Sequence, residues 1–120
     1  MRPFRRTHKS EIEAIRIALG GAGAVVNVLH QSGRLHGTAG MPDLYIQVPP
    51  KRTTLCGCDG FAFWVEVKVG RDKLRREQVA FAIMESSFPP PHREVVIGGL
   101  KETVDYYNAK RPNHPIRITG

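Results

Sequence analysis

Two acids and a lysine stand where the pattern of this chain predicts strands. Asp43 follows Gly-Met-Pro at the start of an apolar run, and Glu66 and Lys68 lie among valines after 22 intervening residues. Charged side chains in such positions are unfavourable unless they pair with an opposite charge or bind a metal. Because side chains alternate along a strand, Glu66 and Lys68 share one face of it.

A hairpin would bring Asp43 and Glu66 together, because the start of one strand then lies beside the far end of the next. Two converging carboxylates form a hard oxygen site of the kind that Mg²⁺ and Mn²⁺ prefer. Such an ion lowers the pKa of a bound water and neutralises charge on a phosphate. Lys68 would point into the same pocket and stabilise a developing oxyanion. The alternative is an exposed Glu66–Lys68 pair with Asp43 in a turn.

The elements that must position these residues are readable from periodicity and turn signals. We expect a basic arm over residues 1–9 and then a helix over residues 10–22, because Ser10 and Glu13 form a capping box. Strands are predicted over residues 24–30, 44–48, 61–69 and 93–97. Further helices are predicted over residues 74–87 and 100–108, with loops at 31–40 and 51–60.

This order, αβββαβα, predicts an α/β fold with a mixed β-sheet flanked by helices. The chain of 120 residues is long enough for one hydrophobic core. We therefore expect one domain over residues 10–110, followed by a tail, residues 111–120, that either adds an edge strand or stays irregular.

The charge of the chain favours a polyanionic partner. Eighteen Lys and Arg stand against eleven Asp and Glu, a net charge of +7, and a basic surface attracts nucleic acid. The residues expected to contact a DNA backbone are Arg34, His36, Lys73 and Arg76. The alternative for these cations is an ordinary solvated surface.

Two cysteines, Cys56 and Cys58, are one residue apart, a spacing that is poor for a structural disulfide. We therefore expect a reducing compartment, the cytoplasm. No Cys-x2-Cys or paired histidine spacing supports a zinc site. No apolar run approaches the roughly 20 residues needed to cross a bilayer, and no secretory signal is evident, so no membrane partner is expected.

Asp43, a spacer and then Glu66-x-Lys68 resemble the PD-(D/E)xK nuclease superfamily. Gly-Met-Pro-Asp, Phe-Trp-Val-Glu-Val-Lys and a following helix with Gln78 resemble more specifically the virus-type replication-repair nuclease (VRR-NUC) family. The resemblance runs over residues 10–108, nearly the whole chain, and implies a restriction-endonuclease-like fold.

The resemblance also implies roles for particular residues. Asp43 and Glu66 would ligate the metal, with the backbone carbonyl of Val67 as a further ligand. Lys68 would assist the attacking water, and Gln78 would help to position the site.

A glutamate of the first helix also contributes in this superfamily. Here Glu11 and Glu13 are both candidates. We favour Glu11 as a metal ligand, because it lies four residues before Ile15 on the core-facing side.

The function expected from the resemblance is that of a Mg²⁺-dependent DNA endonuclease, with Mn²⁺ as a substitute. Stand-alone members of the family are similar to Holliday-junction resolvases, so we expect a homodimer that cuts branched or flapped DNA in a bacterial or phage-infected host cell. A rival hypothesis is a non-catalytic basic DNA-binding module on a nuclease-like fold. A sequence-specific restriction enzyme would share the same site, but no recognition code is evident.

Overall fold

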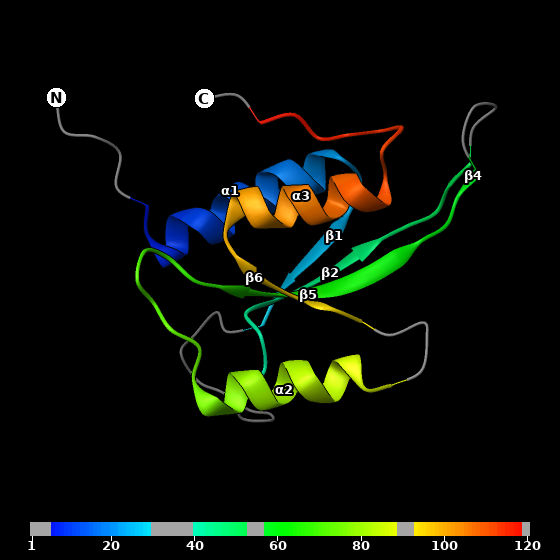
Figure 1. Ribbon diagram of the computed structural model, residues 1–120. Helices are drawn as coiled ribbons and strands as arrows, with labels where there is room; N and C mark the ends of the chain where they lie inside the picture. The colour runs from blue at the N-terminus through cyan, green and yellow to red at the C-terminus, as the bar shows by residue number, and fades with distance from the viewer. Residues whose placement is uncertain (1–5, 30–39, 53–56, 89–92, 119–120) are drawn as a thin grey trace, which may run out of the picture.

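The computed structural model describes residues 6–29, 40–52, 57–88 and 93–118, which form a sheet with helices on both faces (Figure 1). The main sheet has four strands in the order β1-β2-β5-β6. They are β1 (Val25–Val28), β2 (Leu44–Val48), β5 (Phe61–Val67) and β6 (Val95–Gly98). Because β6 is parallel to β5 and the other neighbours are antiparallel, the sheet is mixed, as predicted.

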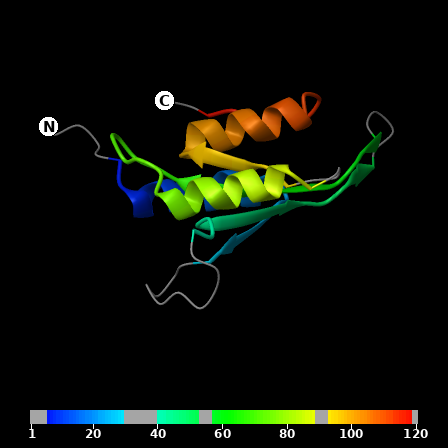
Figure 2. The same ribbon diagram turned by 60° about the horizontal axis from the view of Figure 1, so that its bottom comes forward.

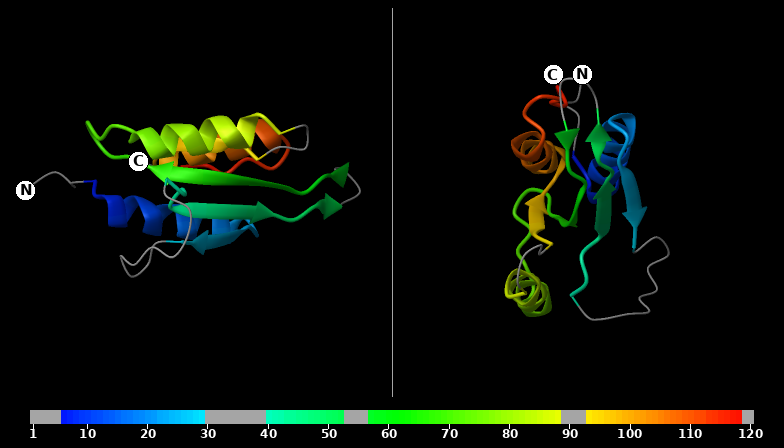
Figure 3. Two further views of the ribbon diagram at one scale, coloured as in Figure 1. Left: turned by 90° about the horizontal axis from the view of Figure 1, so that it is seen from below. Right: turned by 90° about the vertical axis from the view of Figure 1, so that its right-hand side faces the viewer.

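Within the part of the chain that the structure describes, three helices cover this sheet. α1 (His8–Gly21) and α3 (Leu100–Lys110) pack together on one face, and α2 (Arg76–Ser86) lies on the other (Figures 1 and 2). Figure 3 shows the same layers from two further directions. The mixed α/β architecture expected from the sequence is therefore confirmed at this level.

The core lies between the sheet and the α1–α3 layer. Ile15 and Leu19 of α1 are completely buried, as are Phe63 and Val65 of β5. Burying each such side chain contributes roughly 1.5–3 kcal/mol. Because side chains alternate, the neighbouring positions of β5 face α2 instead.

The hairpin of β2 and β5 has the register needed to bring the two acids together. Leu44 lies opposite Val65, so Asp43, one residue earlier, is level with Glu66, one residue later. The strand pairing expected from the sequence is therefore confirmed, and the chemistry-bearing residues lie at one end of the sheet.

The first helix begins earlier than predicted. Thr7 is its N-cap, and Thr7 and Ser10 bond reciprocally, with each backbone N–H donating to the other side-chain oxygen at 2.9–3.0 Å. Glu13 contacts Arg16 at 3.2 Å instead of capping the helix. The predicted box of Ser10 with Glu13 was wrong, because Thr7 offers a competing hydroxyl one turn earlier.

Other boundaries differ by a few residues. The predicted loop over residues 51–60 contains a two-stranded hairpin, β3 (Lys51–Arg52) with β4 (Gly57–Cys58). α2 and β6 each begin two residues later than predicted. Over residues 111–118 the tail adds no strand to the sheet; Ile116 bonds both ways with the Asn108 side chain, at 2.8 and 2.9 Å.

Cys58 is disulfide-bonded, which contradicts the expectation of unpaired cysteines. The only other cysteine of the chain, Cys56, lies outside the described residues. The argument from the cysteines for a reducing compartment therefore has no support. Within the described residues, no helix is long and apolar enough to cross a membrane.

Candidate active site

Asp43 and Glu66 are both buried, with 9% and 4% of their surface exposed. Oδ2 of Asp43 accepts a hydrogen bond from the backbone N–H of Val67 at 2.9 Å, which ties the start of β2 to the end of β5. Oε1 of Glu66 accepts from the Gln78 side chain at 2.5 Å, whereas Oε2 is buried without a hydrogen-bond partner among the described residues. A buried carboxylate oxygen left this way is costly unless something else binds it.

The pKa of Glu66 is raised from 4.5 to about 7. Burial is the main cause, and the nearby negative charge of Asp43 adds to it. The positive charges of Lys68 and Arg75 lower the pKa but do not cancel these effects. The two cations therefore do not offset the burial of Glu66 and the charge of Asp43, and a divalent cation beside the two carboxylates would favour their ionised forms.

Lys68, just after the end of β5, lies near Glu66, as the alternation of side chains along the strand predicted. Its Nζ is 3.8 Å from Oε1 of Glu66, and only 17% of its side chain is exposed. The ammonium group is thus held next to the acidic pair without neutralising it completely.

Gln78 joins α2 to the site through two hydrogen bonds. Its Oε1 accepts from the backbone N–H of Arg75 at 2.7 Å and so caps the start of α2. Its Nε2 donates to Oε1 of Glu66. The amide is therefore oriented by the helix terminus and brought into contact with the Glu66 carboxylate.

Gly40 allows the loop before Asp43 to pass closely under α2. Its φ is +85°, and a Cβ at this position would lie 2.2 Å from the backbone oxygen of Glu77. Only glycine meets both demands. Gly40 thus sets the spacing between the Asp43 loop and the helix turn that carries Gln78.

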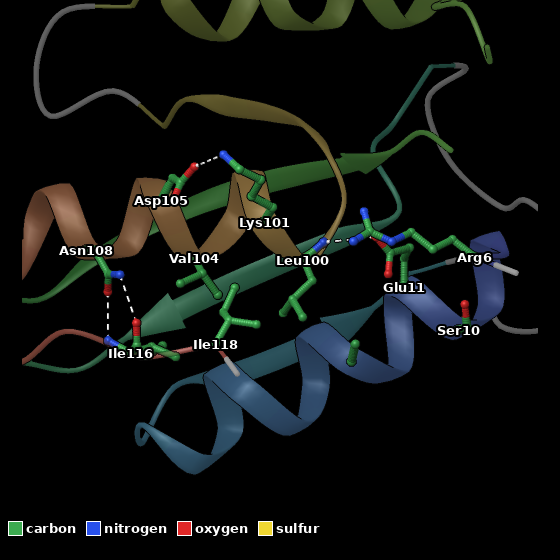
Figure 4. A pocket seen from close by; sticks show the side chains of 11 residues that line it. Arg6, Ser10, Glu11, Leu100, Lys101, Val104, Asp105, Asn108, Ile116 and Ile118 are labelled. Carbon is green, nitrogen blue, oxygen red and sulfur yellow. Dashed lines mark hydrogen bonds and ion pairs between the residues drawn. The ribbon is translucent and has the colours of Figure 1, made fainter. Parts of the chain in front are cut away.

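Glu11 is buried, as expected for its place on α1, and its described contacts are with the start of α3 and with Arg6. Its Oε1 is 3.4 Å from the backbone N–H of Leu100 and 4.0 Å from Arg6 (Figure 4). It lines a pocket of about 570 Å³ between α1 and α3. None of the contacts described for Glu11 involves Asp43 or Glu66, so its assignment as a metal ligand stays a prediction.

The cations predicted to bind DNA are described only in part. Lys73 and Arg76 lie beside the start of α2 and are exposed, as are Arg71 and Arg75. Arg34 and His36 lie outside the described residues. Of these four cations, Arg75 is close enough to Glu66 for its positive charge to lower the pKa of that carboxyl group.

His8 is a site residue that the sequence analysis missed. Its Nε2 lies 3.3 Å from Oδ2 of Asp43, although it was assigned to the basic arm. The Thr7-x-x-Ser10 pattern was the available signal, because it starts the helix at His8.

Asp43 and Glu66 are the side chains of this site that could hold a hard divalent cation. Two buried carboxylates lie side by side, and one of their oxygens has no hydrogen-bond partner among the described residues. Over the same residues, no group of three or more His, Cys, Asp and Glu side chains is arranged to hold a metal. Mg²⁺ needs few protein ligands, because it keeps several waters and also takes phosphate oxygens.

Comparison with known proteins adds no further assignment. No protein-family model matches the chain, and neither does any curated protein or solved structure.

Proposed function

We propose that this protein is a metal-dependent nuclease that hydrolyses phosphodiester bonds in DNA. The observation that carries the proposal is the pair of buried carboxylates, Asp43 and Glu66, with an ammonium group 3.8 Å from one of them. A domain that only bound DNA would gain nothing from acids facing phosphates, because without a cation they repel the ligand. The motif resemblance to VRR-NUC nucleases supports the same assignment.

In this proposal Asp43 and Glu66 hold Mg²⁺, or Mn²⁺ in its place, and the Val67 carbonyl is a further ligand. When bound, the ion supplies charge that polarises the phosphate and favours deprotonation of water. Lys68 stabilises the negative charge that develops on the phosphate and orients the attacking water. Gln78 keeps the Glu66 carboxylate in one orientation.

The proposed substrate is DNA, with branched or flapped structures preferred. A net charge of +7 attracts the phosphate backbone in a salt-dependent manner. Lys73 and Arg76, exposed at or just before the start of α2, are the described cations proposed to contact it. Because DNA is the proposed substrate, we propose the cytoplasm of a bacterial or phage-infected cell as the place of action.

The proposed assembly is a homodimer, which would let two strands of a junction be cut. Four large apolar side chains on and just after α2 are exposed: Val79, Ile83, Met84 and Phe88. Apolar side chains grouped on one element favour a protein partner over solvent. A second copy is the partner proposed, because a two-fold axis would then pair two identical sites.

The test is cleavage of a supercoiled plasmid and of a four-way junction with Mg²⁺ or Mn²⁺. Asp43→Ala and Lys68→Ala should each lower the rate by at least about 10²-fold, because each removes charge stabilisation at the reacting phosphate. Gln78→Ala should lower it by about 10–100-fold, since a hydrogen-bond partner of a ligand is lost. Asp105→Ala removes an exposed acid of α3 and should cleave like the wild type.

Cleavage that disappears only in the site variants supports the enzyme. DNA binding without cleavage by any version, with either ion, would identify a binding module instead. A defined cut pattern on the plasmid would point to a sequence-specific enzyme with the same active site.

A further inference from the structure

We propose that His8 is a positioning residue that orients Asp43 for the cation. In this arrangement Nε2–H of His8 donates to Oδ2 of Asp43, which leaves Oδ1 as the oxygen for the ion. The inference rests on the proposed metal-dependent function and adds a residue that neither the motif nor the resemblance assigns.

The geometry is that of one oxygen held from two directions. Oδ2 of Asp43 is 2.9 Å from the backbone nitrogen of Val67 and 3.3 Å from Nε2 of His8. An ionised carboxylate only accepts, so the imidazole must supply the hydrogen at Nε2. With both donors on Oδ2, the carboxylate cannot rotate without breaking at least one hydrogen bond.

Local structure explains why His8 reaches this position. The reciprocal Thr7–Ser10 bonds fix the start of α1, and His8 is its first residue. The helix thus carries the imidazole to a carboxylate 35 positions further along the chain. The cap holds the backbone at His8, so less conformational entropy is lost when the ring bonds to Asp43.

Because His8 is half exposed, its removal should affect metal affinity much more than the stability of the fold, which distinguishes a positioning role from a purely structural one. Half of its side chain is exposed, whereas Asp43 is buried and already bonded to the backbone. Removing a half-exposed ring leaves no large cavity and no unpaired buried donor. Metal affinity should respond strongly, because hydrogen-bond partners of metal ligands typically contribute about 10–100-fold.

The experiment measures Mn²⁺ binding to the whole chain without DNA, from the electron paramagnetic resonance signal of free Mn²⁺. His8→Ala should weaken binding by about 10–100-fold. His8→Gln should recover most of the affinity, because its amide can donate to the same oxygen. Lys9→Ala changes the exposed neighbour and should bind like the wild type. The thermal midpoint in EDTA should be the same for all four proteins.

Two outcomes separate this inference from the proposed function. If the wild type binds Mn²⁺, Asp43→Ala does not and His8→Ala is unchanged, the role of His8 is wrong while the metal site stands. If the wild type does not bind Mn²⁺, or Asp43→Ala binds equally well, the proposed function fails and this inference with it.

A second measurement tests the hydrogen bond on the unmodified protein. Long-range ¹H–¹⁵N correlation spectra should show His8 protonated at Nε2, both in EDTA and with saturating Mg²⁺. Loss of the Nε2 proton on adding Mg²⁺ would mean that the imidazole itself binds the ion, which would overturn the positioning role.

Discussion

At the scale of single residues, the fold places two acids so that burial and mutual repulsion disfavour the ionised form of Glu66. Glu66 is withdrawn from water beside a second acid, Asp43, and its two neighbouring cations offset this only in part. Keeping an ionised carboxylate there destabilises the folded chain unless a cation is bound. A bound cation would relieve this repulsion, which favours binding of the proposed metal. The stability of the chain, its pH dependence and metal binding are therefore coupled at Glu66.

This coupling predicts a pH-dependent difference between the wild type and Glu66→Gln in EDTA. The folded-state pKa of Glu66 is raised from 4.5 to about 7, so the folded chain keeps a proton that the unfolded chain releases between these values. The contribution of Glu66 to stability is therefore full below pH 4.5 and is lost as pH rises through 7. The loss is on the order of 3 kcal/mol, at about 1.4 kcal/mol per pKa unit.

The measurement is the free energy of unfolding from urea titrations at pH 5 and pH 8. Glu66→Gln should be more stable than the wild type at pH 8, with the difference shrinking at pH 5. Saturating Mg²⁺ should stabilise the wild type at pH 8 and leave Glu66→Gln unchanged. Equal pH profiles in EDTA would contradict the raised pKa.

At the scale of elements, the site exists because three segments meet at one end of the sheet. The β2–β5 hairpin aligns the two acids, the start of α2 delivers Gln78, and the start of α1 delivers His8. The Gly40 turn lies close to the backbone of α2, where a Cβ at Gly40 would clash with Glu77. The distance between hairpin and helix therefore depends on one position without a side chain.

Gly40→Ala is predicted to damage both stability and the site. The new Cβ would lie 2.2 Å from the Glu77 carbonyl oxygen at a backbone φ of +85°, so α2 must shift away from the hairpin. We expect a loss of at least about 2 kcal/mol in the free energy of unfolding, and weaker Mn²⁺ binding because Gln78 moves with the helix.

Gly20→Ala is the matched control. It adds the same methyl group within α1, where nothing lies within 4 Å, so stability should stay the same or rise by up to about 1 kcal/mol. Urea unfolding of both variants provides the measurement. Wild-type stability in Gly40→Ala would show that the close approach is not rigid.

At the scale of the whole molecule, the α1–α3 layer and the α2 layer differ in how far they bury their apolar side chains. The α1–α3 layer buries most of them against the sheet and exposes Ile17, whereas α2 buries only Phe81 and exposes Val79, Ile83 and Met84. Phe81 packs edge-on against Trp64 at 5.3 Å, which holds the helix on the sheet. The outer side of α2 is therefore the surface proposed for self-association.

Ile83→Lys is predicted to break the proposed dimer without unfolding the chain. Ile83 is 63% exposed, so the substitution removes little from the core but places a charge in the interface. Sedimentation equilibrium at micromolar concentration should show a dimer for the wild type and a monomer for the variant. Ile17→Lys alters an equally apolar, 69% exposed position on α1 and should remain dimeric. A monomeric wild type would refute the assembly.

The sequence by itself determined the order of the helices and of the main-sheet strands, but not the β3–β4 hairpin, and it pointed to Asp43, Glu66 and Lys68 as the centre of the candidate site. Alternation placed Glu66 and Lys68 on one face, and the two strand segments could be recognised from local patterns, whereas Gln78 came only from the motif resemblance. Hairpin pairing then required Asp43 to come level with Glu66, which the register confirms.

Only the tertiary structure decided which groups surround these residues. Whether the N-cap of the first helix is Thr7 or Ser10 depends on which hydroxyl caps it. Because Thr7 is the N-cap, His8 belongs to α1 and contacts Asp43, and is not part of the predicted arm. The direction of Glu11 depends on where the start of α3 lies, far away in the chain. Burial and repulsion from Asp43 raise the pKa of Glu66, and both require packing between segments that no local pattern encodes.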